Sequence, residues 1–387
     1  MSYWSWVVAV AMVASAGWVG AAEPASTADP VWKTAYVKRT FMGNFQAPWA
    51  DPKAGDGQGA HGAVRMRTPL AVGGARAKVF VQGSFEKRVE VVRMSLVRGA
   101  DEMGKAAGDE LPVTFGGQRG LVLEARANPR TSDVVVGPLT AGTWYVEDAY
   151  ASATVPYAYE VDYGWWRTGG EGAPGTKTQV RLGVVRRVDV LTADRRPLVA
   201  CFGDSITAGL GSTPNAGRRY TDVLAKLADR PVLNLGTNGD TMAANGALWN
   251  AVGGLAGVEV AVVLLGTNDV AVGKSMKSAE DYAKLAKGNV AELQRRKIKV
   301  VWGTVPPCGG FKAFDADPAR EALRQAINGW IRSGSGADAV VDFDAALRDP
   351  AAPARMKVEY HNGDWIHPSD AGYQRMGEVA AEAVGKI

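Results

Sequence analysis

The sequence contains only two cysteines, Cys201 and Cys308, in 387 residues. Two cysteines are too few for a disulfide framework, and neither stands at metal-ligand spacing from a histidine, so we expect no zinc site and no cofactor. Cys201 lies inside an apolar run of strand length, where a small buried thiol is the expected state. A bond between the two cysteines stays open at this stage.

Dense clusters of one charge sign are also missing. The formal net charge is only +4, and no block of Lys and Arg has the density that nucleic-acid binding requires, so DNA and RNA are not expected partners. We interpret the pairs Arg195–Arg196 and Arg218–Arg219 as solvated. The hydrophobic share of 47% is that of an ordinary globular protein, with enough apolar residues for two domains or one large one.

Long apolar runs are missing after the N-terminus. Residues 1–22 form an apolar stretch that ends in Gly20, Ala21 and Ala22, small residues at which a signal peptidase would cut. This pattern predicts a signal peptide and an exported protein, either periplasmic or extracellular. The stretch lacks the usual Lys or Arg at its start and is nearly long enough to span a bilayer, so an uncleaved anchor is the alternative. Apart from such an anchor, we expect no membrane contact.

Histidine is scarce, with three residues in the chain: His61, His361 and His367. Only His367 has the setting of a catalytic histidine, because Asp364 precedes it by three positions and one turn of backbone can present both side chains. The carboxylate would then orient the imidazole and stabilise the imidazolium that forms during catalysis. We interpret His61 and His361 as surface or structural residues, although His361 is close enough in sequence to line a site.

A nucleophile for this histidine follows an apolar run at residues 198–202. The run stops at Gly203-Asp204-Ser205, which is how a buried parallel strand delivers one side chain to the carboxyl edge of its sheet. A serine hydroxyl is a weak nucleophile and needs a base within hydrogen-bond reach. The sequence therefore predicts Ser205 as the nucleophile, His367 as the base and Asp364 as the group that orients the base.

Four short motifs follow one another along the second half of the chain: Gly203-Asp204-Ser205, Gly239, Gly266-Thr267-Asn268-Asp269 and Asp364-Trp365-Ile366-His367. In this order they resemble the motifs of the GDSL/SGNH hydrolases, and the resemblance covers roughly residues 197 to 385. It implies an oxyanion hole made of the backbone N–H groups of Ser205 and Gly239 and the side-chain amide of Asn268. Ile206 stands where the family motif has Leu, an apolar exchange that leaves the chemistry unchanged.

Strand patterns alternate with helical patterns from residue 197 onward. The predicted strands are 198–202, 231–235, 258–265, 299–305 and 339–343, and the clearest predicted helices are 220–227 and 319–331. This alternation predicts an α/β fold with a parallel sheet flanked by helices on both faces. The resemblance implies the SGNH-type, flavodoxin-like form of that fold.

Period-two alternation dominates residues 30–190. The strand candidates are 64–67, 77–83, 88–96, 112–115, 120–124 and 142–148. They predict an all-β sandwich domain, which also resembles the jelly-roll-like module that precedes the catalytic domain in some bacterial members of the family. We therefore predict a signal peptide at 1–22, a β-sandwich domain at 23–192 and an SGNH hydrolase domain at 193–387. Trp165 and Trp166 would form either an aromatic surface for a sugar or, as we prefer, a contact with the second domain.

The resemblance implies a serine esterase that works through an acyl-enzyme intermediate. The segments 211–220 and 341–350 resemble those of secreted esterases associated with plant cell-wall polysaccharides, so we expect an acetyl ester on a polysaccharide or oligosaccharide such as xylan. A lipase, a lysophospholipase or a thioesterase would use the same site. A non-catalytic carbohydrate-binding protein is the remaining alternative, against which the intact Ser205, Asn268, Asp364 and His367 speak.

Overall fold

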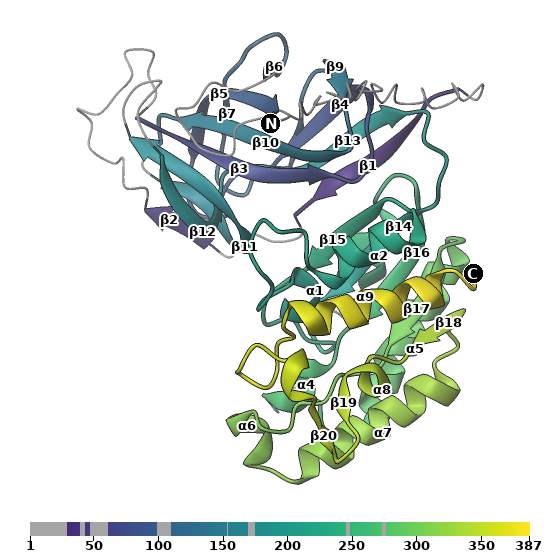
Figure 1. Cartoon of the computed structure of the whole chain (residues 1–387). Coiled ribbons are helices and arrows are strands. Elements are labelled where there is room, and N and C mark those ends of the chain that lie inside the picture. Colours follow the sequence, from purple (N-terminus) through teal and green to yellow (C-terminus); the bar gives the residue numbers. More distant parts are fainter. Residues whose placement is uncertain are drawn as a thin grey trace, which may run out of the picture.

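The computed structural model describes residues 29–38, 43–46, 61–98, 110–152, 154–168, 175–244, 248–272 and 276–387. The predicted signal peptide at residues 1–22 lies outside the described residues. The chain forms a strand-rich N-terminal region (residues 29–192) and a C-terminal region (residues 193–387) in which strands alternate with helices (Figure 1). Among the described residues, no helix has both the length and the apolar character needed to cross a bilayer.

The N-terminal region consists of two antiparallel sheets. One has the order β1-β13-β4-β8, with β9 paired to β4, and the other has the order β12-β11-β3-β10-β5-β6, with β2 paired to β11 and β7 to β5. The bounds are β1 (Val31–Val37), β2 (Gly43–Gln46), β3 (Gly62–Leu70), β4 (Gly74–Val81), β5 (Val89–Arg98), β6 (Glu110–Val113), β7 (Leu121–Leu123), β8 (Arg130–Thr131), β9 (Val135–Leu139), β10 (Gly142–Tyr150), β11 (Thr154–Thr168), β12 (Thr176–Leu182) and β13 (Val185–Thr192).

One apolar core joins the two sheets. Val79 and Val188 enter it from the first sheet, and Met94 and Val146 enter it from the second. Side chains that alternate along each strand reach this core from one face only, which explains the period-two pattern of the sequence. The predicted all-β region before the parallel sheet is confirmed.

The paired tryptophans pack inside the N-terminal region. Trp165 is 5% exposed and meets Tyr145 edge-on, with ring centroids 6.2 Å apart, in a small apolar cluster separate from the main core. Trp166 packs against the main core. Neighbouring residues of a strand point to opposite faces, so the two indoles pack on opposite faces of the sheet, Trp165 buried and Trp166 partly buried. The prediction that the pair contacts the second domain is therefore wrong.

The C-terminal region is built on a parallel sheet of order β15-β14-β16-β17-β18. Its strands are β14 (Leu198–Gly203), β15 (Val232–Gly236), β16 (Val258–Leu264), β17 (Lys299–Gly303) and β18 (Ala339–Val341). The remaining elements are α1 (Ser205–Ala208), α2 (Tyr220–Ala228), α3 (Leu248–Gly253), α4 (Thr267–Ala271), α5 (Ala279–Arg295), α6 (Lys312–Asp315), α7 (Ala319–Gly334), α8 (Phe343–Leu347), β19 (Arg348–Asp349), β20 (Ala352–Met356), η1 (Val358–Tyr360) and α9 (Asp370–Val384).

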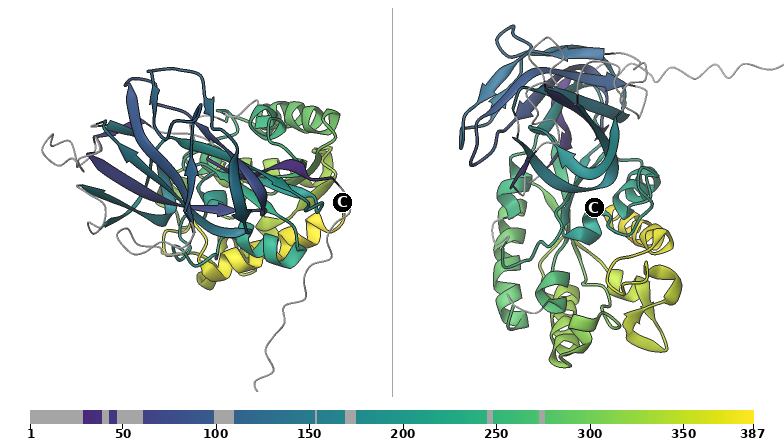
Figure 2. Two further views of the ribbon diagram at one scale, coloured as in Figure 1. Left: turned by 90° about the horizontal axis from the view of Figure 1, so that it is seen from above. Right: turned by 90° about the vertical axis from the view of Figure 1, so that its left-hand side faces the viewer.

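Helices cover both faces of this sheet (Figure 2). Phe202 and Val263 join one core with residues of α5 and α7, whereas Cys201 and Val262 join the other with residues of α2 and α9. Strands buried on both faces read as continuous apolar runs, which is why the sequence predicts them well. The α/β fold is confirmed, and both cysteines are buried and free.

The strand order also determines where a site can form. Numbered along the chain, the strands lie in the order 2-1-3-4-5, so the chain moves from β14 to one side to make β15 and later returns to the other side to make β16. The loops after β14 and β16 therefore leave the sheet in different directions. Open α/β sheets bind ligands in the crevice at such a point, at the carboxyl ends of the strands.

Candidate active site

Ser205 stands at the junction between β14 and α1. All six residues of β14 are buried, and Asp204 caps the helix because its Oδ1 accepts a hydrogen bond from the Ile206 amide at 2.9 Å. Position 203 has no room for a side chain, since a Cβ there would lie 2.1 Å from Thr207 Oγ1 and 2.4 Å from the Leu264 carbonyl oxygen. The tight turn places the Ser205 side chain at the carboxyl edge of the sheet.

The loop before α9 brings Asp364 and His367 to Ser205. Ser205 Oγ lies 2.8 Å from His367 Nε2, and His367 Nδ1 lies 2.6 Å from Asp364 Oδ2. The other oxygen, Asp364 Oδ1, accepts hydrogen bonds from the backbone amides of Ile366 at 2.9 Å and His367 at 2.8 Å. One carboxylate therefore shapes the turn and also holds the ring.

The charge of Asp364 decides which nitrogen of His367 carries the proton. Burial acts to raise the pKa of Asp364, but the hydrogen bonds from the His367 side chain and from the His367 and Ile366 amides lower it to about 2. An ionised carboxylate only accepts hydrogen bonds, so Nδ1 of His367 must be the donor. In the neutral ring Nε2 is then free of a proton and accepts the Ser205 hydroxyl.

Trp365 follows Asp364 in the loop before α9 and has a left-handed backbone, with a φ of 65°. Its ring stacks on His361 at 3.9 Å between centroids and packs against Gly310, where a Cβ would lie 2.5 Å from an indole carbon. His361 Nδ1 in turn accepts a hydrogen bond from the Gly363 amide at 3.0 Å. His361 thus supports the loop that carries Asp364, whereas His61 lies in the N-terminal region, where its amide donates to the Tyr150 carbonyl oxygen at 2.8 Å.

Gly239 and Asn268 lie in the loops that follow β15 and β16. Gly239 is exposed in a turn with a φ of 76°, a conformation that side-chain-bearing residues rarely adopt. Asn268 occupies the first turn of α4, and its Nδ2 donates to the Asp240 carbonyl oxygen at 2.8 Å. The end of β15 abuts the nucleophile helix, because a Cβ on Gly236 would lie 2.0 Å from the Ala208 amide nitrogen. The two loops are therefore tied together beside α1.

Two buried acids near Ser205 were not identified from the sequence. Burial raises the pKa of Asp204 to about 7, against the amide of Ile206 and the charge of His367, and the nearby carboxylates of Asp240 and Asp269 raise it further. Asp269 is fully buried and accepts a hydrogen bond from the Met242 amide at 2.7 Å, so it fixes the loop after Asp240. Both acids lie next to predicted site residues within the motifs, and that adjacency is the signal that would have identified them.

No group of three or more His, Cys, Asp or Glu side chains in the described part of the chain is arranged to hold a metal ion. Ser205, His367 and Asp364 form a chain of hydrogen bonds, and Asp364 also accepts hydrogen bonds from the backbone. The arrangement supplies a hydroxyl, a base and an orienting carboxylate, which are the groups that acyl transfer needs.

Comparison with known proteins finds one matching family model and several similar solved structures. Residues 201–375 match the family described as GDSL-like Lipase/Acylhydrolase, while none of the curated proteins compared matches the chain. The chain is similar to a GDSL-like lipase from Bacteroides thetaiotaomicron VPI-5482, with 19% identity over 49% of this chain and 88% of that chain and a TM-score of 0.39. It is also similar to a pair of carbohydrate esterases, both described as family two. One, from Clostridium thermocellum in complex with cellohexaose, is 18% identical over 90% of this chain and 100% of that chain, with a TM-score of 0.35. The other, from Cellvibrio japonicus, is 12% identical over 92% of this chain and 94% of that chain, with a TM-score of 0.37.

The matched range includes every residue that the sequence singles out for the site: Ser205, Gly239, Asn268, Asp364 and His367. It also includes β15 to β18 and the end of β14, and Ser205, Gly239 and Asn268 lie in the segments that follow β14, β15 and β16. Residues 201–375 are therefore a GDSL-like lipase/acylhydrolase domain, and the protein is a carboxylic ester hydrolase.

Proposed function

We propose that the protein is a serine esterase that removes short acyl groups, acetyl above all, from an acetylated polysaccharide or oligosaccharide such as xylan. One observation carries the esterase mechanism: Ser205, His367 and Asp364 form a chain of hydrogen bonds of 2.8 and 2.6 Å at the carboxyl edge of the sheet. A hydroxyl so placed can lose its proton to the imidazole as it attacks a carbonyl carbon.

The first half of the reaction makes an acyl-enzyme. Ser205 Oγ bonds to the ester carbonyl carbon while its proton passes to His367 Nε2, and Asp364 stabilises the imidazolium that results. The tetrahedral intermediate collapses when the C–O bond to the sugar breaks, and His367 returns the proton to the leaving alkoxide. In the second half, His367 takes a proton from water as the resulting hydroxide attacks the acyl carbon. The bond between the acyl carbon and Ser205 Oγ then breaks, His367 returns the proton to Ser205 Oγ, and acetic acid leaves.

The oxyanion of each intermediate needs fixed donors. We assign the backbone N–H groups of Ser205 and Gly239 and the side chain of Asn268 to this role. The Asn268 amide has two protons, and its bond to the Asp240 carbonyl oxygen orients the group so that the other proton can serve the substrate. Such donors stabilise the transition state by roughly 3 to 4 kcal/mol each.

The preference for acetyl rests on the polarity and openness of the site. The loops after β15 and β16 that carry the oxyanion donors are rich in polar residues, among them Asn238, Asp240 and Asn268. The Asp364 side chain is 41% exposed, so the site is open to water beside His367. An open polar site leaves room for a bulky sugar on the alcohol side and offers little apolar surface to a long acyl chain.

We also propose that the chain divides into a signal peptide at 1–22 and domains at 23–192 and 193–387, and that the protein is exported. The division is supported by the buried cores, because the described residues of the first core end at Val190 and those of the parallel sheet begin at Leu198.

A panel of aryl esters with acyl chains of increasing length, together with acetylated xylan, tests the proposal. We expect the highest kcat/KM for the acetyl ester, acetate release from the polysaccharide, and a steep fall as the chain lengthens. Ser205→Ala protein gives the background rate. A maximum at about eight carbons or more, or a preference for thioesters, would replace this proposal by a lipase or thioesterase function.

A further inference from the structure

We infer that Asp162, a residue of β11 in the N-terminal region, is a positioning residue for the active site of the C-terminal region. The inference rests on the proposed function only for its activity readout. It concerns residues 209–219, here called the bridging loop, which connect the nucleophile helix α1 to α2.

The bridging loop is bonded to the segment that carries His367. Tyr373 Oη of α9 donates to the Leu210 carbonyl oxygen at 2.8 Å, and Asp370, the first residue of α9, accepts hydrogen bonds from Thr213 N at 2.8 Å and Thr213 Oγ1 at 2.7 Å. Gly211 lies so close to this segment that a Cβ there would be 2.7 Å from the Pro368 carbonyl oxygen. The loop therefore sets the position of the His367 segment relative to α1.

Arg219, at the end of the bridging loop, packs against the end of the nucleophile helix. A Cβ on Gly209 would lie 2.2 Å from Arg219 Cγ, and the Gly209 amide donates to the Ser205 carbonyl oxygen at 3.0 Å. The Arg219 guanidinium bonds Asp222 through Nε at 2.8 Å and Nη2 at 3.0 Å. Arg219 is only 7% exposed, so the interpretation of Arg218–Arg219 as a solvated pair is wrong for this residue.

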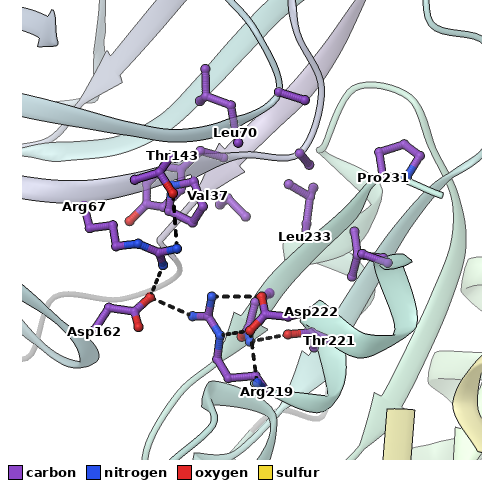
Figure 3. A pocket seen from close by; sticks show the side chains of 18 of the residues that line it. Val37, Arg67, Leu70, Thr143, Asp162, Arg219, Thr221, Asp222, Pro231 and Leu233 are labelled. Carbon is purple, nitrogen blue, oxygen red and sulfur yellow. Dashed lines mark hydrogen bonds and ion pairs between the residues drawn. The ribbon is translucent and has the colours of Figure 1, made fainter. Parts of the chain in front are cut away.

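Asp162 holds the bridging loop at two points from the other region of the molecule. Its Oδ1 accepts a hydrogen bond from the Asn215 amide at 2.7 Å, and its Oδ2 lies 3.4 Å from Arg219 Nη1. The same oxygen is paired with Arg67 of β3, whose Nη2 donates to Thr143 Oγ1 at 3.2 Å. Figure 3 shows the Asp162 carboxylate between the two guanidinium groups, one from each region.

The contacts of Asp162 with Arg67 and Arg219 are buried between the two regions, so their loss should affect the bridging loop. Asp162 is 6% exposed, and the network lies on the wall of a cavity of about 350 Å³ between the two regions. Polar contacts of Asp162 therefore join the regions on this wall, in addition to the apolar contacts that Val37 and Ala71 make with the core of the C-terminal region. Removing a buried carboxylate that serves two guanidinium groups leaves both charges without that partner, which is costly in a buried setting. We expect the bridging loop to loosen, and the Ser205–His367 geometry with it.

The test compares Asp162→Asn, which keeps the shape but removes the charge, with Thr34→Val. Thr34 makes another contact between the regions, since its Oγ1 accepts a hydrogen bond from the Ala256 amide at 3.0 Å. Among the described residues, Thr34 has no hydrogen bond to the bridging loop. For Asp162→Asn we expect kcat to fall about 10- to 100-fold with KM within about twofold, because a small misplacement of reacting groups acts on the chemical step. Thr34→Val should keep the wild-type kcat.

Hydrogen exchange measures the positioning without any substrate. In Asp162→Asn the amides of residues 209–219 and 362–370 should exchange faster, while those of the central strands of both regions keep wild-type rates. This readout separates the two proposals, since a wild-type protein without esterase activity would end the proposed function and leave the exchange result standing. Wild-type kcat and wild-type exchange in Asp162→Asn would overturn the inference, as would an equal loss of kcat in Thr34→Val.

Arg219→Met gives a second route that leaves Asp162 in place and keeps the methylene packing on Gly209. It should reproduce the loss of kcat and the faster exchange of the same two segments. In the double variant with Asp162→Asn the effects should be far from additive, because both changes break one contact. Additive effects would show that the two residues act separately and would overturn the inference.

Discussion

The two regions of the molecule both bury polar side chains, but they use them differently. In the N-terminal region charged side chains pair across neighbouring strands: Glu147 of β10 bonds Arg65 of β3 at 2.8 Å and lies 3.5 Å from Arg167 of β11. In the C-terminal region Ser205 and Asp204 are buried at the end of a strand. Antiparallel strands deliver their ends to both edges of a sheet, whereas parallel strands deliver all their carboxyl ends to one edge. We therefore expect side chains from several strand ends to meet in one site only in the C-terminal region.

The largest expected contrast is between two buried serines, Ser205 and Ser132, each 7% exposed. Ser205→Ala should lower kcat for an aryl acetate by a factor on the order of 10⁶, because the members of a triad act as a unit. Ser132→Ala removes a hydroxyl that accepts a hydrogen bond from the Val79 amide at 2.9 Å, so it should affect stability and leave kcat alone. Comparable kcat values for the two variants would contradict the assignment of Ser205 as the nucleophile.

The next contrast lies within the C-terminal region and separates an oxyanion donor from a structural amide. Asn268→Ala should lower kcat about 10²- to 10³-fold with little change in KM, since the bond to the substrate oxygen strengthens in the transition state. Asn289→Ala is the control, because Asn289 is buried and, like Asn268, donates from Nδ2 to a backbone carbonyl oxygen, in its case that of Leu285 at 3.0 Å. A rise in KM alone for Asn268→Ala would make this residue a ground-state contact instead.

The smallest effect concerns two fully buried acids, Asp148 in the N-terminal region and Asp204 beside Ser205. Burial raises the pKa of each to about 7, and a hydrogen bond from Tyr150 to Asp148 and one from the Ile206 amide to Asp204 oppose the rise. The folded protein therefore holds these protons more tightly than the unfolded chain, whose acids have a pKa near 3.9. Their contribution to stability is complete below about pH 4 and is lost as the pH rises through about 7.

Replacing either acid by Asn removes its share of this pH dependence. Relative to wild type, the free energy of unfolding of each variant should gain on the order of 1 kcal/mol per pH unit between about pH 5 and 7. Denaturant titrations at several pH values measure the difference. Only Asp204→Asn should also change kcat, because only Asp204 interacts with His367. Parallel pH curves for variant and wild type would contradict the raised pKa values.

Much of the fold could be predicted because burial leaves a local pattern. The runs that become β14 to β17 are mostly apolar, since both faces of the parallel sheet are covered, and the alternating runs of β3 to β5 face one core. The fifth predicted strand, 339–343, ends early at Val341 because Asp342 caps α8, where its side chain accepts a hydrogen bond from the Ala345 amide at 3.0 Å. A capping side chain competes with strand continuation, and the apolar pattern does not record it.

The sequence predicts only those residues of the site that lie within short motifs. Ser205, Asn268 and the Asp364–His367 pair each lie where a motif follows or precedes a regular element, and the structure brings Ser205, His367 and Asp364 into hydrogen-bond contact. Their catalytic roles stay predictions that the variants above test. Asp162 and Arg219 are far apart in sequence, and nothing local in either segment indicates the pair, because it depends on how the two regions meet.

Covalent labelling tests the central claim most directly. A serine that is activated by a base attacks the phosphorus of a fluorophosphonate and displaces fluoride, so mass spectrometry of the treated wild-type protein should show one adduct, on the peptide that contains Ser205, in step with the loss of esterase activity. Ser205→Ala protein should take up no label, and His367→Ala protein should take it up far more slowly. An active wild-type protein that carries the adduct on another residue, or that keeps full activity without labelling, would contradict the assignment of Ser205 as the nucleophile.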